Sequence, residues 1–319
     1  MNQNPIQTKT SVSRRSSACL ITSALALIAA GHSVSGAALS GSMSESFDYG
    51  AGTQVPNAST LNGGTGWNLN GDGGANAAGA NWGAANNGGA PEWRTVTSPG
   101  LTYNTIGYVN GGGNKLTLDA SGNNVNQNVG RNFGGQTIDS GTTYFSLLMA
   151  KNIDSLRTIN FAFFNGTTER FAVGQIGAAA GNSGGNIALL MNNQNPAGLI
   201  QNATSPVAMG VDVTHLLIGR IDWNPDGFET VSLWVDPANV TSEGAAGAAY
   251  LSTSGFELTA LTGIRPFVGN LGGGFPAVSA DFDEIRLGTT WAAVVPEPAT
   301  GTLLGLGALA LAFRRKNVR

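Results

Sequence analysis

Cysteine, histidine and charge are all scarce in this 319-residue sequence, and each shortage excludes a class of function. The single cysteine, Cys19, lies inside an apolar stretch near the N-terminus, and His215 is the only histidine beyond residue 32. One cysteine cannot form a disulfide within a chain, and the cysteine and histidine ligands of an ordinary zinc site are missing. We therefore expect no thiol nucleophile, no metal and no cofactor.

Charged residues make up 11% of the chain, against roughly 25% in an average globular protein. Between the two terminal segments, nine Lys and Arg stand against eighteen Asp and Glu, so the net charge of this part is near −9. Such a surface repels phosphates, and nucleic acid is not an expected partner. The 47 glycines, together with many Asn, Ser and Thr residues, instead suit short strands that are joined by turns.

The N-terminal segment 1–38 has the layout of a secretory signal peptide. Lys9, Arg14 and Arg15 precede an apolar run over residues 18–30, and small residues follow this run. The alternative is an uncleaved membrane helix. Thirteen apolar residues are too few to span a hydrocarbon core of about 30 Å comfortably. The pattern therefore predicts an exported chain with an N-terminal signal helix.

The C-terminal segment 295–319 consists of a Pro-Glu-Pro motif, an apolar stretch and a basic end. Two prolines keep the motif extended, and cations after an apolar stretch resist transfer across a membrane. The segment therefore predicts an apolar C-terminal helix that stays in the bilayer, with the body of the protein outside. The motif comprises Val295, Pro296, Glu297 and Pro298, and the membrane stop comprises Arg314, Arg315 and Lys316.

In order and position, these three parts resemble the PEP-CTERM sorting signal of bacterial exported proteins. The resemblance implies recognition by an exosortase, a membrane transpeptidase-like enzyme, and a location in the cell envelope or outside the cell. The expected partners are therefore this processing enzyme and the membrane. An ordinary C-terminal anchor is the alternative. A terminal strand does not fit, because the apolar run is long and lacks alternation.

The region 39–294 is predicted to form a single all-β domain, a two-sheet antiparallel sandwich of the jelly-roll type. Gly- and Asn-rich loops are expected over 50–115. In the segment 229–235, strict alternation directs Val231, Leu233 and Val235 to the core and Trp234 to the opposite face. The predicted strands, each bounded by turn-forming residues, are 142–150, 157–164, 170–176, 186–191, 215–223, 229–235, 263–269 and 279–287.

Five stretches of the body carry a second resemblance: residues 47–49, 61–68, 98–103, 220–237 and 281–294. Together they resemble laminin-G-like, concanavalin-type domains of bacterial sorting-signal proteins. The resemblance implies a jelly roll of a kind that is usually associated with glycan or protein binding, and it assigns no ligand to any residue.

Three groups of residues are candidate chemical sites. His215 precedes an apolar strand and is better explained by a strand edge than by catalysis. Residues 222–227 read D-x-N-x-D-G, which opens a calcium loop but also suits a hairpin turn, and the turn is favoured. Asp281, Asp283 and Glu284 could supply a glycosidase-like carboxyl pair. A solvated face, or pairing with Arg286, is the simpler interpretation.

Aromatic side chains are the remaining candidates, because their faces stack on sugar rings. Trp234, Trp67 and Trp82 are possible glycan contacts, although tryptophan in a sandwich is more often part of the core. We predict an exported surface or extracellular-matrix protein that is structural or adhesive, with exopolysaccharide as the candidate ligand and with no catalytic residues and no enzyme activity. The alternatives are a polysaccharide-active enzyme, either a glycoside hydrolase or a lyase, and a passive spacer.

Overall fold

The computed structural model describes residues 37–55, 94–108, 112–120, 126–133, 135–177, 183–191, 201–269 and 277–295. The expected signal helix and apolar C-terminal helix both lie outside these residues. Within the described ranges, no helix is long and apolar enough to cross a membrane.

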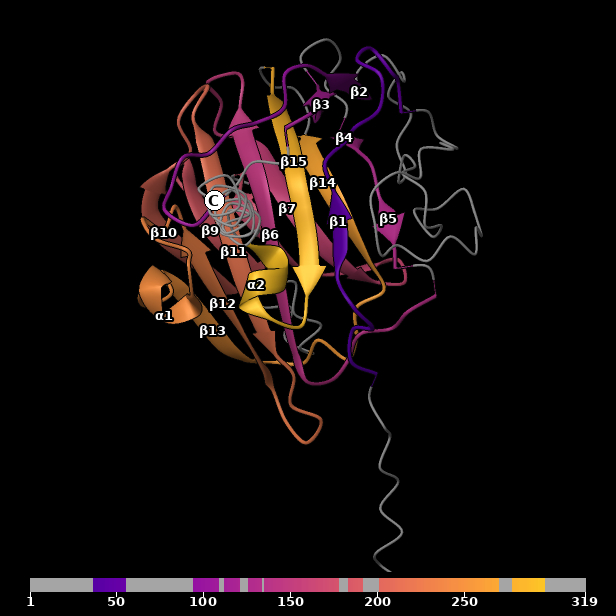
Figure 1. The fold of residues 1–319 in the computed structure, drawn as a ribbon, viewed down its shortest axis with the longest axis vertical. Coiled ribbons are helices and arrows are strands. Elements are labelled where there is room, and N and C mark those ends of the chain that lie inside the picture. Colours follow the sequence, from indigo (N-terminus) through magenta and orange to yellow (C-terminus); the bar gives the residue numbers. More distant parts are fainter. Residues whose placement is uncertain are drawn as a thin grey trace, which may run out of the picture. The chain divides into compact units, whose positions relative to one another are not determined.

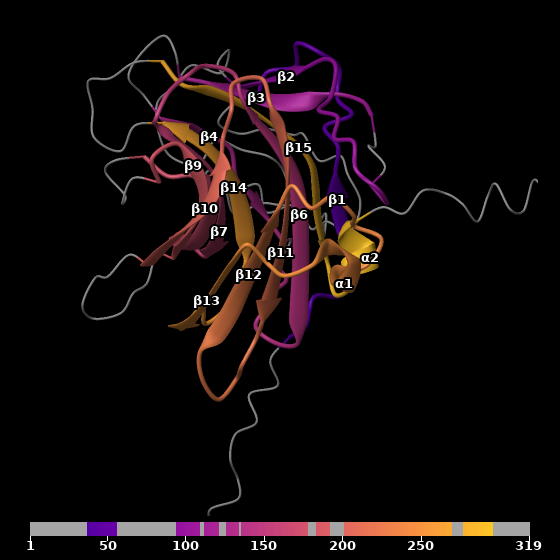
Figure 2. The ribbon, with the colours of Figure 1, turned by 90° about the vertical axis from the view of Figure 1, so that its left-hand side faces the viewer.

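Two antiparallel β-sheets stacked face to face make up the body, which confirms the predicted fold class (Figures 1 and 2). In the first sheet, β1 (Met43–Glu45) pairs with β15 (Ser279–Gly288) and stands outside the linear order of the other strands, which we call the main path. The spatial order of the main path is β13 (Leu251–Phe256), β12 (Glu229–Val235), β11 (Thr214–Asp222), β6 (Thr142–Lys151), β15 (Ser279–Gly288), β3 (Lys115–Asp119) and β2 (Arg94–Thr97).

The second sheet packs against one face of the first. Beside its main path, β5 (Arg131–Asn132) pairs with β14. The spatial order is β10 (Gln201–Ala208), β9 (Asn186–Met191), β8 (Thr168–Gln175), β7 (Thr158–Asn165), β14 (Gly263–Gly269) and β4 (Gln127–Asn128). Two short helices complete the described elements, α1 (Glu243–Ala246) and α2 (Trp291–Val294).

The main core fills the space between the sheets. Phe145 of the first sheet meets Phe163 and Phe171 of the second, with ring centroids 4.7 Å apart for Phe145–Phe163 and 4.3 Å for Phe163–Phe171. Gly219 lies opposite Phe145 in the β11–β6 ladder, and a Cβ at this position would lie 2.0 Å from the ring. The missing side chain therefore leaves the space that the ring occupies.

A second apolar cluster covers part of the outer face of the first sheet, and we call it the outer cluster. Figure 2 shows both helices on this side of the sheet. The residues come from β6, β11, β12, α2 and the segments around 101–108 and 240. The buried members are Leu101, Tyr108, Leu148, Ala150, Leu216, Ile218, Trp234, Val240, Trp291, Val294 and Val295.

All eight predicted strands are present, and their ends agree with the prediction within two residues. The strands that the sequence did not reveal include β2, β10 and β13, which lie at sheet edges. Edge strands are often polar and short, so they carry little alternation. β2 also lies inside the range 50–115 that was expected to be loop.

Candidate functional site

A groove of about 620 Å³ opens on the outer face of the first sheet, beside the outer cluster. Strands β11, β12 and β13 contribute side chains to it, and α1 with the turn that follows contributes mostly small residues. The lining residues are Arg220, Ser232, Trp234, Glu243, Gly244, Gly247, Ala248, Ala249 and Ser252.

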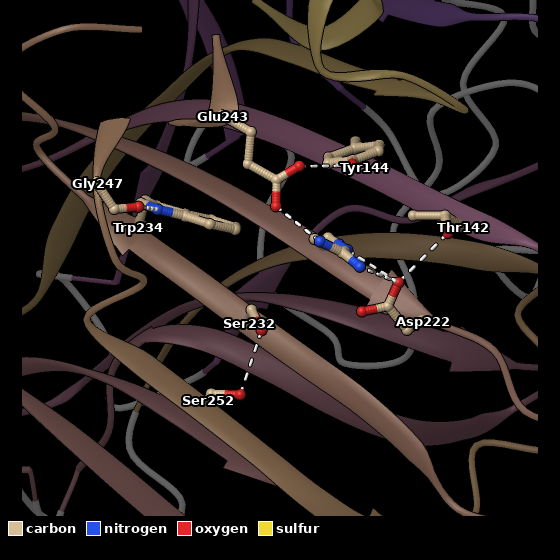
Figure 3. A network of polar contacts seen from close by, with 9 residues as sticks. Thr142, Tyr144, Asp222, Ser232, Trp234, Glu243, Gly247 and Ser252 are labelled. Atoms are coloured by element: carbon tan, nitrogen blue, oxygen red, sulfur yellow. Dashed lines mark hydrogen bonds and ion pairs between the residues drawn. The ribbon is translucent and has the colours of Figure 1, made fainter. Parts of the chain in front are cut away.

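Strand register places three of the polar groups in a row. Arg220 pairs with Ser232 across β11 and β12, and Ser232 pairs with Ser252 across β12 and β13. Because Val231 and Leu233 point into the core, Ser232 and Trp234 point into the groove from the opposite face. The two serine hydroxyls lie 3.2 Å apart (Figure 3).

Helix α1 supplies the carboxylate on the other side of the groove. Ser242 caps the helix by accepting a hydrogen bond from the Ala245 amide at 3.1 Å. Glu243 follows in the first turn, where a negative charge suits the helix N-terminus. Gly247, with φ of 78°, ends the helix in a conformation that favours glycine.

The guanidinium of Arg220 is held between two carboxylates. Its Nε and Nη2 each lie 2.8 Å from Asp222 Oδ1, and its Nη1 donates to Glu243 Oε1 at 2.7 Å (Figure 3). The hydrogen bonds to Glu243 and Asp222 raise the pKa of Arg220. One cation facing two carboxylates leaves this network with a net charge of −1.

Tyr144 and Thr142 of β6 extend the same network. The Tyr144 hydroxyl donates to Glu243 Oε2 at 2.7 Å, and Thr142 Oγ1 donates to Asp222 at 3.3 Å. Burial, together with the bond to Glu243, raises the pKa of Tyr144 to about 12, so its hydroxyl stays protonated and remains a donor. Both oxygens of Glu243 are therefore occupied and oriented.

Trp234 occupies the outward position that alternation predicted, but its side chain is only 5% exposed. Its ring packs edge-to-face on Trp291 of α2, with centroids 5.2 Å apart, and its Nε1 donates to the Gly247 carbonyl at 2.9 Å. Trp234 thus forms part of the groove wall and links the groove to α2. Trp67 and Trp82 lie outside the described residues.

For the acidic run on β15, the sequence left open a solvated face or pairing with Arg286, and the solvated face is wrong. Asp281, Asp283 and Glu284 are all buried. Asp281 pairs with Lys115 at 2.7 Å, and Glu284 pairs with Arg286 at 2.5 Å, so only the predicted arginine pairing is present. The segment around Leu101 and Tyr108 covers the strand from a distant part of the sequence, which local patterning could not indicate.

Asp283 of β15 has a strongly perturbed carboxyl. Burial raises its pKa to about 8, although the amides of Glu284 and Leu101 donate to it, each at 2.8 Å. Burial, with a further contribution from Glu284, also raises the pKa of Tyr108. These groups form a second polar site on the same face of the sheet.

The other candidate sites from the sequence have structural explanations. His215 lies at the start of β11, is buried, and its Nδ1 is 2.7 Å from Asp236. Residues 222–227 connect β11 to β12, and the Gly227 amide donates to the Asn224 carbonyl as in a turn. Within the ranges that the structure describes, no group of three or more His, Cys, Asp or Glu could hold a metal ion.

Of the sorting motif, only Val295 lies among the described residues, and it is buried in the outer cluster. The remaining sorting and membrane-stop residues lie outside: Pro296, Glu297, Pro298, Arg314, Arg315 and Lys316. Arg220, Glu243 and Tyr144 were not among the residues predicted from the sequence. Strand alternation could have indicated that Arg220 points to the outer face of β11. Its pairing with α1 joins two separate segments, which alternation does not indicate.

Residues 294–316 match the protein-family model described as the PEP-CTERM protein-sorting motif, which confirms that motif. The motif marks the chain as an exported protein that is sorted through its C-terminus, and it is a signal recognised by exosortase. No curated protein sequence matches the chain.

Solved structures that resemble the chain include carbohydrate-active enzymes and a binding domain. An endo-β-1,4-glucuronan lyase from the fungus Trichoderma reesei has 16% identity and a TM-score of 0.41, over 64% of this chain and 90% of its own. An alginate lyase mutant bound to alginate trisaccharide has 11% identity and a TM-score of 0.40, and the match covers 78% of this chain and 98% of the lyase. The botulinum neurotoxin serotype G binding domain has 10% identity and a TM-score of 0.38, and the match covers 63% of this chain and 47% of that chain.

These matches correct one expectation from the sequence. The prediction that the chain is not an enzyme is wrong, because enzyme activity is not excluded. Glucuronan and alginate lyases and glucanases are among the structures that the chain matches. At such identities and TM-scores, the matches carry no activity over to this chain. The laminin-G-like assignment stays a prediction. The chain therefore consists of a two-sheet β-sandwich that is followed in the sequence by a confirmed sorting motif.

Proposed function

We propose that this chain works at the bacterial cell surface or in the extracellular matrix, where its sandwich binds carbohydrate through the groove beside α1. The export and sorting part rests on the motif at 294–316. The single observation that supports carbohydrate binding is the groove itself. It combines two serine hydroxyls, an oriented carboxylate, a guanidinium and a tryptophan wall in one open space.

This set of groups suits a sugar with several hydroxyls. Glu243 accepts hydrogen bonds, Arg220 donates, and the hydroxyls of Ser232 and Ser252 can do either. The small residues of the opposite wall, from Gly244 to Ala249, allow a ring to approach the backbone closely. A few convergent polar groups beside an apolar wall are the usual composition of a small-ligand site.

The charges favour a neutral sugar over an acidic one. Arg220 already contacts Asp222 and Glu243, so a uronate carboxylate would have to compete for it in a region of net charge −1. A further negative charge at about 6 Å costs between about 0.7 kcal/mol in bulk water and about 3 kcal/mol at the effective dielectric near a protein surface, a range that includes a tenfold loss of affinity. We therefore propose exopolysaccharide with neutral or amino sugars as the ligand class.

Isothermal titration with a matched pair of glycans tests this proposal. The pair is a neutral β-1,4-glucan oligosaccharide and the same oligosaccharide oxidised at C6 to uronate. We expect the neutral form to bind about tenfold more tightly, and Glu243→Gln to reduce that preference because it removes a negative charge. Asp226→Asn, in the exposed β11–β12 turn, is the charge-matched control. Stronger binding of the uronate form would contradict the proposed ligand class.

Cell fractionation tests the sorting part separately. Deleting residues 296–319 leaves the described body intact and removes the Pro-Glu-Pro motif, the apolar stretch and the basic end. We expect the protein to move from the envelope to the medium. An unchanged envelope fraction would sink the sorting proposal and leave the groove proposal standing.

One observation favours a second function, a polysaccharide-active enzyme. Asp283, with a pKa raised to about 8, lies next to Glu284, and a carboxyl that is protonated near neutral pH is what a general acid requires. Asp283 is completely buried beneath the Leu101 segment, so a substrate reaches it only if that segment moves. Release of oligosaccharides from polysaccharides by the native chain, abolished in Asp283→Asn, would support this function. Full activity in that variant would exclude Asp283 from it.

A further inference from the structure

The sorting motif and the folded body overlap by two residues. The match to the motif begins at Val294, yet Val294 and Val295 are 0% and 1% exposed and belong to the outer cluster. Pro296 follows directly in the chain. Within the described part of the chain, the final residue is buried, and the Pro-Glu-Pro sequence follows it with no linker.

Several contacts hold these two valines in place. Ser146 Oγ on β6 donates to the Val294 carbonyl at 2.5 Å, and the Val295 amide donates to the Trp291 carbonyl at 3.1 Å. Trp291 is in turn fixed by its Nε1, which donates to the Val240 carbonyl at 2.8 Å. Extracting Val295 therefore disturbs both a buried hydrogen-bonded turn and an apolar cluster.

The approach of α2 to the sheet is close as well. A Cβ on Gly288, the last residue of β15, would lie 2.5 Å from Cβ of Ala293. Trp291 also packs edge-to-face on Trp234 and Tyr144. The end of the body is therefore a packed part of the sandwich, anchored on the same face as the groove.

We infer that Val295 is a structural residue of the body and that the processing enzyme reads the motif from Pro296 onward. The inference rests on the sorting part of the proposed function. An enzyme that binds a side chain must surround it, and the sandwich already surrounds Val295. The folded body thus limits how closely the enzyme can approach Pro296, and loosening α2 makes that approach easier.

The test compares the stability and processing of the full chain in Val295→Ala. A structural role predicts a lower midpoint of thermal unfolding, by about 5 °C for one truncated buried side chain in a domain of this size. The same role predicts a processing rate in cells that is unchanged or up to a few-fold faster. A recognition role predicts the opposite pattern, slower processing with unchanged stability. Slower processing, or an unchanged midpoint, would overturn the inference.

Three control variants separate the possible causes. Val294→Ala should behave like Val295→Ala, because both side chains fill the outer cluster. Val173→Ala, in the main core, should lower stability without speeding processing, since it leaves α2 in place. Pro296→Ala should slow processing with no effect on stability. If Pro296→Ala were processed normally, the sorting proposal itself would fail, whatever the valine variants do.

An insertion provides a second measurement that does not depend on a weakened fold. A Gly-Ser-Gly linker between Val295 and Pro296 keeps the body and the motif intact and changes only the spacing between them. We expect processing to be retained or accelerated. Loss of processing would show that the enzyme reads Val295 and Pro296 as one continuous sequence, which contradicts the inference.

Discussion

The two faces of the first sheet are covered to different extents and in different ways. The inner face packs on the second sheet through apolar side chains such as Leu147, Leu217 and Leu233. The outer face is covered by segments from distant parts of the chain, and it mixes the outer cluster with ionisable groups such as Asp283 and Glu284. The inner face therefore determines the fold, whereas the outer face holds the groove, the perturbed carboxyl and the exit of the tail.

The difference shows which part of the protein depends on electrostatics. Apolar packing between the sheets is insensitive to pH, whereas a carboxyl buried on the outer face links stability to its protonation state. The following predictions test this contrast, and their expected effects decrease in size.

Removing the central ring of the inner core should have the largest effect. Phe163→Ala removes a fully buried side chain that contacts Phe145 and Phe171, and we expect a loss of about 3–5 kcal/mol in the free energy of unfolding. Denaturant unfolding of the full chain measures it. Phe228→Ala, at an exposed phenylalanine, is the control and should cost little. Equal losses in the two variants would contradict the assigned core.

The pH dependence of stability should come from the outer face. Because folding raises the pKa of Asp283 from 3.8 to about 8, protonated Asp283 favours the folded state, and this contribution is lost as pH rises from about 4 to 8. We expect the free energy of unfolding to fall over this window, by at most about 1.4 kcal/mol per pH unit for one group.

Asp283→Asn should remove most of this slope, although the amide keeps only one of the two hydrogen bonds from backbone N–H groups. Unfolding measured at a series of pH values gives the result. Asp226→Asn, in an exposed turn, should leave the slope unchanged. A slope that survives in Asp283→Asn would assign the pH dependence to another group.

A smaller effect is expected where β6 contacts the end of α2. Ser146→Ala leaves the buried Val294 carbonyl without its donor and should cost about 1 kcal/mol. Hydrogen exchange of the peptide that contains Val295 should become faster, while exchange in the second sheet stays the same. Uniform acceleration across both sheets would mean that α2 does not open locally.

The smallest effect is expected in the groove. Arg220 is about one-third exposed, and ion pairs in such positions contribute roughly 0–1 kcal/mol. Arg220→Gln should therefore change glycan binding while leaving the free energy of unfolding almost unchanged. A loss above about 2 kcal/mol would show that the network supports the fold more than it serves a ligand.

The inner face could be predicted from the sequence because its information is local. In β12, Val231, Leu233 and Val235 alternate with polar residues, and the structure buries all three. The short helix α2 has no such signal, since four residues cannot show a helical period. Edge strands such as β10 and β13 were missed because their sequences are polar.

The site could be predicted only in part, because its contacts join distant segments. Alternation placed Trp234 on the outer face, but its burial depends on Trp291, more than fifty residues later. Glu243 reaches Arg220 only because α1 folds back over β11. Alternation leaves Asp283 on the outer face, and its burial depends on Leu101, from the N-terminal part of the body, whose amide donates to it.

The position of β15 determines how the body carries mechanical load. The chain leaves the sandwich from α2, directly after β15, and β15 is bonded to β6 on one side and to β3 and β1 on the other. A force transmitted through the tail therefore enters the body through a strand flanked on both edges. A pull along this strand must shear many hydrogen bonds together instead of opening them one at a time.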